Sequence, residues 1–231
     1  MRADFIQGLR RKLHSHGLQN TLDAFVLKAL NRVFVVKILR GVCVEQADAS
    51  FLKVPQNYQA GFLTADELRS YSCDPRTEIS SEFLDEALGR GDQCYAIRDG
   101  ATLAAYGWYS AGSTPIGLGD LVLNFSRHYV YMYKGFTDAR YRGQRLHAIG
   151  MTRALAHYLS GGYNGLVSYV EAHNFDSLKS CFRMGYRVFG SIYVVRVFGR
   201  FHAWSSAGCS RFGFRLDHAA PGAPALTFGK N

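Results

Sequence analysis

Three arginines and a glycine lie within one short stretch, RYRGQRLHAIG at residues 140–150, between a strand-like run and a helix-like run. The start of a helix exposes backbone N–H groups and the positive end of the helix dipole, so phosphate groups bind there readily. Gly143 lets a ligand approach the backbone, and Arg142 and Arg145 add donors suited to a pyrophosphate. The pattern indicates an anion site, with a solvated first turn of surface arginines as the alternative.

Two common phosphate-binding motifs are missing from the chain. No GxGxxG follows a strand-like run and no GxxxxGK[ST] occurs, which argues against a Rossmann dinucleotide site and against a P-loop. The formal net charge of +9 still favours an anionic partner, such as a nucleotide cofactor, a nucleic acid, an acidic carrier protein or a membrane surface. The charge alone does not choose among these partners.

The five cysteines bear on location and on metal binding. They are widely spaced, without a CxxC pair or a histidine cluster, and so predict neither a disulfide framework nor a zinc site. Arg10, Arg11 and Lys12 interrupt the first apolar residues, and no apolar run reaches the roughly 20 residues that span a bilayer. We therefore expect a cytoplasmic protein without a secretory signal and without a metal.

The residues on either side of the arginine stretch predict the elements that position it. The run HYVYMYKGF at 128–136 is typical of a strand, with its three tyrosines on one face. A helical pattern follows and ends at a Gly-Gly pair; its apolar residues are Ala148, Met151, Leu155 and Tyr158. The run LVSYV at 166–170 is the next strand, and the crossover is long enough to make the two strands parallel.

The remaining segments predict a mixed α/β fold. We expect a helix at 18–31, a strand at 33–45, a helix at 81–88 and a hairpin around Asp99-Gly100. A short helix capped by Asn174 or Asp176 precedes the closing strands. The chain divides into three predicted parts: a helical N-terminal extension at 1–32, one domain at 33–203 and a flexible tail at 204–231, rich in Gly, Ala, Ser and Pro.

Two segments resemble the GNAT superfamily of acyl-CoA N-acyltransferases. The run TDARYRGQRL at 137–146 is similar to the [RQ]xxGx[GA] signature, although Arg145 and His147 stand where small residues are expected. The run VEAHNFDSLKSCFRMGYRVFG at 170–190 resembles a later segment of the family through Asn174, Ser177, Gly185 and Tyr186. The resemblance covers roughly residues 90–200, and it is to bacterial members that carry a helical N-terminal extension.

The resemblance implies a fold and a donor site. It implies a mixed, mainly antiparallel central sheet with splayed parallel strands and flanking helices, which holds acetyl-CoA or another acyl-CoA in the gap and needs no metal. The donor-binding residues that it implies are Phe136, Thr137, Arg142, Gly143, Gln144, Arg145, Leu146, His147 and Asn174. For Asn174, capping of its own helix is the alternative.

The implied reaction is direct attack of a primary amine on the thioester, which needs a base for the ammonium and an acid for the thiolate. Glu171 and His173 are the candidate bases at the end of the second splayed strand, and Tyr133 lies on the first. Cys181 stands where the family often has a tyrosine that protonates the thiolate. The alternatives are a surface salt bridge for Glu171, a cleft wall for Tyr133 and buried filler for Cys181.

The sequence leaves the acceptor and some partners open. An amino sugar, an amino acid, a polyamine and a protein amine all fit the predicted N-acyltransferase. A close variant takes a long acyl chain from acyl carrier protein, whose acidic surface suits the positive charge. A relative that binds CoA without transferring is also compatible with the residues. The basic N-terminal helix permits peripheral membrane contact, with packing on the domain as the alternative.

An RNA-binding module is the alternative from another class of protein. Lys134-Gly135-Phe136 begins like an RNA-recognition strand, and tyrosines on a sheet face can stack on bases. The next residues, Thr137-Asp138-Ala139, abandon that pattern. Nucleic acid is therefore not the expected partner.

Overall fold

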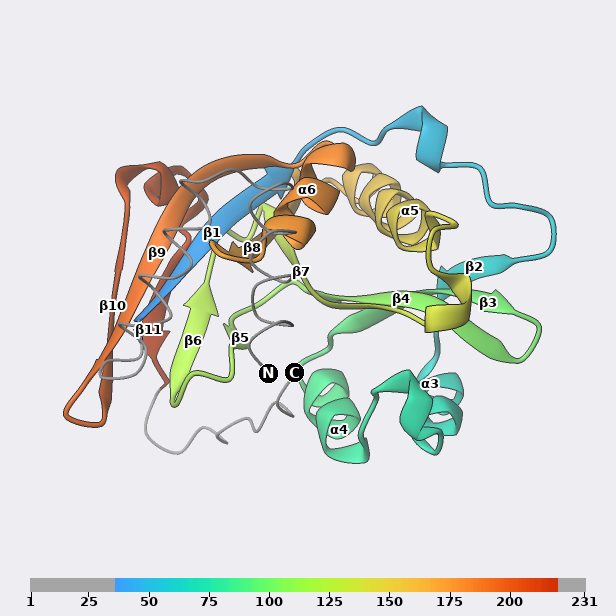
Figure 1. The fold of residues 1–231 in the computed structure, drawn as a ribbon, viewed down its shortest axis with the longest axis horizontal. Coiled ribbons are helices and arrows are strands. Elements are labelled where there is room, and N and C mark those ends of the chain that lie inside the picture. The colour runs from blue at the N-terminus through green and yellow to red at the C-terminus, as the bar shows by residue number, and fades with distance from the viewer. Residues whose placement is uncertain (1–35, 220–231) are drawn as a thin grey trace, which may run out of the picture.

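The computed structural model describes residues 36–219, and Figure 1 shows their arrangement. The predicted helix at 18–31 and the predicted extension at 1–32 lie outside the described residues, as do residues 220–231 of the predicted tail. Among residues 36–219, no helix combines the length and the hydropathy that a membrane crossing requires.

Eight of the strands form one large sheet in the order β10-β9-β1-β8-β7-β4-β3-β2. All neighbours in it are antiparallel except β7 and β8, which are parallel. The strands are β1 Val36–Val44, β2 Gln59–Phe62, β3 Gln93–Asp99, β4 Thr102–Ser110, β7 Tyr129–Thr137, β8 Gly165–Glu171, β9 Arg187–Val197 and β10 Arg200–Ser205. The predicted fold class, a mixed and mainly antiparallel sheet with flanking helices, is confirmed.

A second sheet and several helices complete the described fold. The second sheet has the order β11-β6-β5, with β5 at Thr114–Pro115, β6 at Leu121–Asn124 and β11 at Arg215–His218. The helices are α3 Ala65–Ser72, α4 Ser81–Gly89, α5 Leu146–Ser160 and α6 Phe175–Arg183, with short 3-10 turns η1 Ala49–Phe51, η2 Pro75–Thr77, η3 Ala139–Tyr141 and η4 Ala207–Phe212. Helices α5 and α6 cover one face of the large sheet, and α3 and α4 cover the other (Figure 1).

Side-chain alternation along β7 assigns each of its residues to one of the two layers. Tyr129, Tyr131 and Tyr133 pack in the cluster that contains residues of α3 and α4, as the shared face predicted. Val130 and Met132 pack in the cluster that contains residues of α5 and α6. The strand therefore forms part of both cores, and the burial of both faces explains its almost continuous apolar sequence.

The predicted hairpin is confirmed, but its turn lies one residue later than the sequence suggested. Asp99 pairs with Thr102, so the two central residues are Gly100 and Ala101. Gly100 has a φ of +56°, whereas Ala101 is not among the residues with positive φ. A turn with glycine at its first central position needs positive φ only there, which is why alanine is accepted at the second.

The prediction of a flexible tail from residue 204 is wrong for the residues up to 219. Strand β11 pairs with β6, and the chain before it follows the 3-10 turn η4. Phe212 and Phe214 are 3% and 1% exposed and belong to the core on the α4 side. The small residues suggested disorder, but the apolar ones between them bury enough surface to order the segment.

We expect Phe214→Ala to lower the free energy of unfolding by about 3 kcal/mol, because it removes a buried aromatic ring and leaves a cavity. Phe198→Ala is the matched control, since Phe198 is fully exposed in the turn between β9 and β10, and it should change stability by less than about 0.5 kcal/mol. Urea unfolding measures both. Equal, small effects would mean that the C-terminal segment contributes nothing to the core.

Candidate functional site

The strands β7 and β8 part soon after they begin to pair. Their register covers only Tyr129 with Gly165, Val130 with Leu166, and Tyr131 with Val167. At the parting point the Ser168 hydroxyl donates a hydrogen bond of 2.8 Å to the carbonyl oxygen of Met132. Beyond it, β7 runs on to Thr137 and β8 to Glu171 without pairing to each other. The predicted splay of the two parallel strands is therefore present.

A β-bulge in β7 lies beside the parting strands. Tyr133 pairs with Trp108 and Phe136 pairs with Tyr106, so Lys134 and Gly135 together oppose a single residue of β4. Lys134 has a φ of +45°, which is uncommon for a residue with a side chain. The bulge therefore changes the direction of the strand and of its side chains where the gap opens.

Gly135 in the bulge makes room for His147 at the start of α5. A Cβ atom at position 135 would lie 2.5 Å from Cε1 of His147, which is closer than two non-bonded carbon atoms can approach. Burial lowers the pKa of His147 from its usual value, and a hydrogen bond to the backbone of Tyr106 offsets part of that effect. The imidazole is therefore mainly neutral at pH 7 and is fixed against the bulge.

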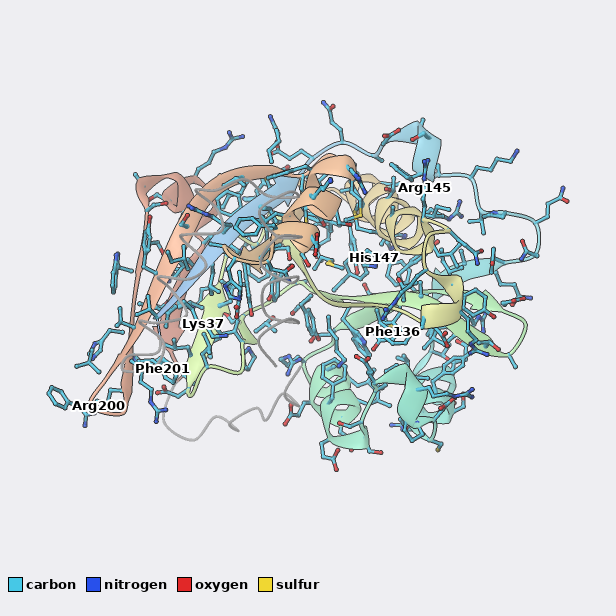
Figure 2. The ribbon with its side chains drawn as sticks, viewed as in Figure 1. Lys37, Phe136, Arg145, His147, Arg200 and Phe201 are labelled. Carbon is cyan, nitrogen blue, oxygen red and sulfur yellow. The ribbon has the colours of Figure 1, made fainter. Side chains whose placement is uncertain are left out.

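A cavity of about 1140 Å³ follows β7 through this region. Residues 131–137 of β7 and 168–170 of β8 line it, and its walls come from both layers of helices. Phe136 lies between the α5 layer and the α3–α4 layer (Figure 2). The wall on the α4 side includes Glu78, Phe83 and Glu86; the wall on the α5–α6 side includes His147, Ser177, Ser180, Cys181 and Met184. The cavity thus joins the two faces of the sheet where the strands part.

The structure places seven of the nine predicted donor-binding residues in two groups. Phe136, Thr137 and His147 line the cavity. Four others, Arg142, Gly143, Gln144 and Arg145, form the exposed loop between η3 and α5. Figure 2 shows Arg145 on the α5 side of the sheet.

Backbone conformation in this loop fits the predicted anion site. Gly143 has a φ of +81°, and nothing lies within 4 Å of where its Cβ would be. Arg145 precedes α5 in the left-handed region, with no side-chain hydrogen bond capping the helix. The Gln144 side chain is engaged elsewhere, since its Oε1 accepts a hydrogen bond of 2.6 Å from Tyr58. The residues that lead into α5 are therefore exposed, and no side chain caps the start of the helix.

Two predicted donor contacts have structural roles. Leu146 is 1% exposed and packs in a small core cluster with Ile97 and Ile149. Asn174 accepts a hydrogen bond of 3.1 Å from the backbone N–H of Ser177 and so caps α6. Capping was the alternative for Asn174 in the sequence, and the structure confirms it.

Glu171 and His173 lie together at the end of β8. The Glu171 carboxylate forms an ion pair with Lys37 of β1, and the Nε2 atom of His173 is 3.2 Å from Oε2 of Glu171. Neither residue is among those that line the cavity. The salt bridge that the sequence left open for Glu171 is therefore present, and a catalytic role for either residue stays a prediction.

Tyr133 lines the cavity, and its hydroxyl forms hydrogen bonds with Asp92 and Arg90. Its hydroxyl donates a hydrogen bond of 2.6 Å to Oδ2 of Asp92, and Arg90 donates one of 3.3 Å to the same hydroxyl. Burial and the nearby Asp92 carboxylate raise the pKa of Tyr133 above its usual value. The side chain is therefore a neutral phenol at pH 7, which makes it unsuited to act as a base.

Cys181 lies in the cavity wall formed by α6. Residues 177, 180 and 181 of α6 and the residue that caps its end, Met184, line the cavity because this spacing places them on one face of the helix. Burial raises the pKa of the Cys181 thiol to about 11. The thiol is therefore protonated at pH 7, the state required of a proton donor.

Sequence reasoning missed three charged residues of the cavity wall: Glu78, Glu86 and Lys134. A local signal was present, because the segment 78–92 has five acidic residues and one basic residue in a chain of net charge +9. Glu86 also follows Phe83 by three positions, which places both side chains on one face of α4. Within residues 36–219, no group of three or more His, Cys, Asp or Glu is arranged to hold a metal ion.

The burial of the sheet tyrosines removes the basis of the RNA interpretation. Stacking on bases needs aromatic rings on an open sheet face. Tyr129, Tyr131 and Tyr133 are 6%, 4% and 8% exposed, because α4 and the second sheet contribute to the same core. No open platform of these three rings exists.

Comparisons with known proteins found similar solved structures. No protein-family model matches the chain, and no curated protein matches it. The solved structures that the chain resembles include several described as acetyltransferases. One such structure is described as a GNAT-family acetyltransferase from Novosphingobium aromaticivorans, at 14% identity and a TM-score of 0.45, over 80% of this chain and 66% of that one.

Two further structures come from other bacteria. A GCN5-related N-acetyltransferase-like protein from Streptococcus suis has 12% identity and a TM-score of 0.48, over 74% of this chain and 65% of that one. An N-acetyltransferase from Staphylococcus aureus has 11% identity and a TM-score of 0.45, over 71% of this chain and 99% of that one. The chain spans just under two thirds of the N. aromaticivorans and S. suis proteins.

We expect alkylation of Cys181 by iodoacetamide to accelerate about tenfold per pH unit between pH 7 and pH 10, because the thiolate fraction rises by that factor below a pKa of about 11. Mass spectrometry of the digested protein quantifies the labelling of each cysteine. Exposed Cys73 in the same digest controls for the reagent. A rate at Cys181 that levels off near pH 8.5 would show an ordinary, solvated thiol.

Proposed function

We propose that this protein is an acyl-CoA-dependent N-acyltransferase that transfers an acyl group, acetyl in the first instance, to a primary amine by direct attack. The observation that carries the proposal is the cavity between the parted strands β7 and β8, which reaches the helices on both faces of the sheet. A transferase for two substrates needs such an opening, because donor and acceptor can then approach the reacting carbonyl from opposite sides.

The α5–α6 side suits the donor. Between residues 132 and 137, the edge of β7 that faces β8 forms no strand ladder, so an extended arm with amide groups can pair there as a strand would. Phe136 and Thr137 line that part of the cavity. The loop with Arg142 and Gly143 leads into α5, whose first N–H groups suit the pyrophosphate at the far end of such an arm.

Proton transfer can be assigned to groups of the cavity wall. The leaving thiolate needs a proton, and the Cys181 thiol is protonated and lines the donor side. The attacking amine must lose a proton first. The Glu171 carboxylate is paired with Lys37 and does not line the cavity, whereas Glu78 and Glu86 line the acceptor side. We propose these two carboxylates as the first proton acceptors.

The test is binding of acetyl-CoA, measured by isothermal titration calorimetry. We expect micromolar affinity for the wild type and at least tenfold weaker binding for Arg142→Ala, which removes a phosphate donor. Gly143→Asp should also weaken binding, because it places a carboxylate where the anion would lie, although nothing in the protein blocks the side chain.

Arg140→Ala is the matched control in the adjacent turn η3. The Arg140 guanidinium is already paired with Asp138 at 2.7 Å, so its loss should leave acetyl-CoA affinity unchanged. Circular dichroism establishes that each variant is folded. Absence of acetyl-CoA binding by the folded wild type would sink the acetyl-CoA proposal, and titration with an acylated acyl carrier protein would then test the alternative donor.

A further inference from the structure

The carboxylates that form no hydrogen bond or ion pair are concentrated in one short segment of the protein. Among residues 36–219, most Asp and Glu side chains take part in a hydrogen bond or an ion pair. Those described without either are Glu78, Glu82, Asp85 and Glu86, and all four lie in one segment of nine residues. The chain has nine more bases than acids, so a group of carboxylates that forms no ion pair distinguishes this segment.

Two of the four line the cavity. Glu78 ends η2 in the left-handed region, with a φ of +57°, and Glu86 lies one helical turn after Phe83 on α4. Glu78 and Glu86 line the cavity, whereas Glu82 and Asp85 do not. The segment therefore offers carboxylates inside the site and matched carboxylates outside it.

The other charged lining groups leave this half of the cavity negative. Lys134 contributes one ammonium, whose Nζ lies 4.7 Å from the centre of the Phe83 ring. Burial lowers the pKa of Lys134, and the charge of Glu78 partly offsets that effect. His147, across the strand, is mainly neutral. Two carboxylates therefore outnumber one ammonium, and a cation entering the cavity would be attracted.

The uncharged groups near these carboxylates suit a compact hydroxylated molecule. Ser72 and Ser80 provide hydroxyls, and Phe83 and Ile116 provide apolar contacts. Alternating hydroxyl and apolar surfaces match a molecule with C–H faces and O–H edges. A long hydrocarbon would displace water from the two carboxylates without offering them a hydrogen bond, which costs free energy.

We infer that the acceptor is a primary amine whose only charge is its ammonium group and which carries hydroxyls, such as an unphosphorylated amino sugar, held by Glu78 and Glu86. This inference rests on the proposed function, since it names the acceptor class of the same cavity. It disfavours α-amino acids and phosphorylated amines, because a second, negative group would face two carboxylates and only one ammonium. Of the acceptors left open by the sequence, the cavity selects the one with hydroxyls and a single positive charge.

The experiment compares matched acceptors at a fixed acetyl-CoA concentration. Each pair differs by one anionic group: glucosamine against glucosamine 6-phosphate, ethanolamine against phosphoethanolamine, and tyramine against tyrosine. CoA release, followed with a thiol reagent, gives kcat/KM for each. We expect at least tenfold higher kcat/KM for the member without the anion, and the highest value for glucosamine.

Isosteric variants then test whether the cavity carboxylates cause the preference for amines without an anionic group. Glu78→Gln and Glu86→Gln should each lower kcat/KM for the preferred amine at least tenfold, because each removes a negative charge and a proton acceptor, and should narrow the gap to its anionic partner, while acetyl-CoA affinity is unchanged. Glu82→Gln is the control, because Glu82 is equally unpaired but lies outside the cavity, and it should behave like the wild type.

The outcomes separate this inference from the proposed function. Preference for the anionic member of the pairs, or Gln variants that all behave like Glu82→Gln, would overturn the acceptor class while leaving acyl transfer intact. Acetyl-CoA binding without transfer to any of the amines lacking an anion would overturn it too. A folded protein that neither binds acetyl-CoA nor releases CoA with any amine would instead refute the proposed function.

Discussion

The parting of β7 and β8 after three paired residues is the constraint on which the rest of the site depends. Elsewhere the large sheet is closed by antiparallel pairing, so it separates the helices on its two faces. The Ser168 hydroxyl stabilises the parting point by bonding to the carbonyl of Met132, a group that a longer ladder would otherwise satisfy. The opening is thus part of the hydrogen-bonded framework rather than a packing defect.

The bulge in β7 gives this opening its shape. Two residues facing one force Lys134 into an unusual backbone conformation and allow Gly135 to contact the imidazole of His147. The same strand presents tyrosines to the α4 layer and Val130 and Met132 to the α5 layer. Strain and close packing are therefore concentrated in the one strand that contacts both halves of the cavity, a placement typical of functional sites.

Charge is organised around the same strand. Most described carboxylates outside 78–86 are paired, including Glu171 with Lys37 and Asp92 with Arg90. Ion pairs and hydrogen bonds therefore compensate the carboxylates over most of the described residues. The carboxylates of residues 78–86, before and within α4, form no ion pair. The positive loop before α5 and the negative wall beside α4 therefore lie on opposite sides of the sheet, an arrangement suited to two substrates of opposite charge.

Local sequence determined the central elements β7, α5 and β8, the parallel crossover and the helix start with its arginines and Gly143, because periodicity, caps and turn residues act over a few neighbours. The local sequence also indicated that Asn174 could cap the helix that follows it. Only the tertiary structure decided that Lys37 of β1 would neutralise Glu171, that Phe212 and Phe214 would order the C-terminal segment, and that Glu86 would share a cavity with Cys181. Such contacts join residues far apart in the chain. They depend on β1 lying between β8 and β9 and on the parting of β7 and β8, which no local pattern encodes.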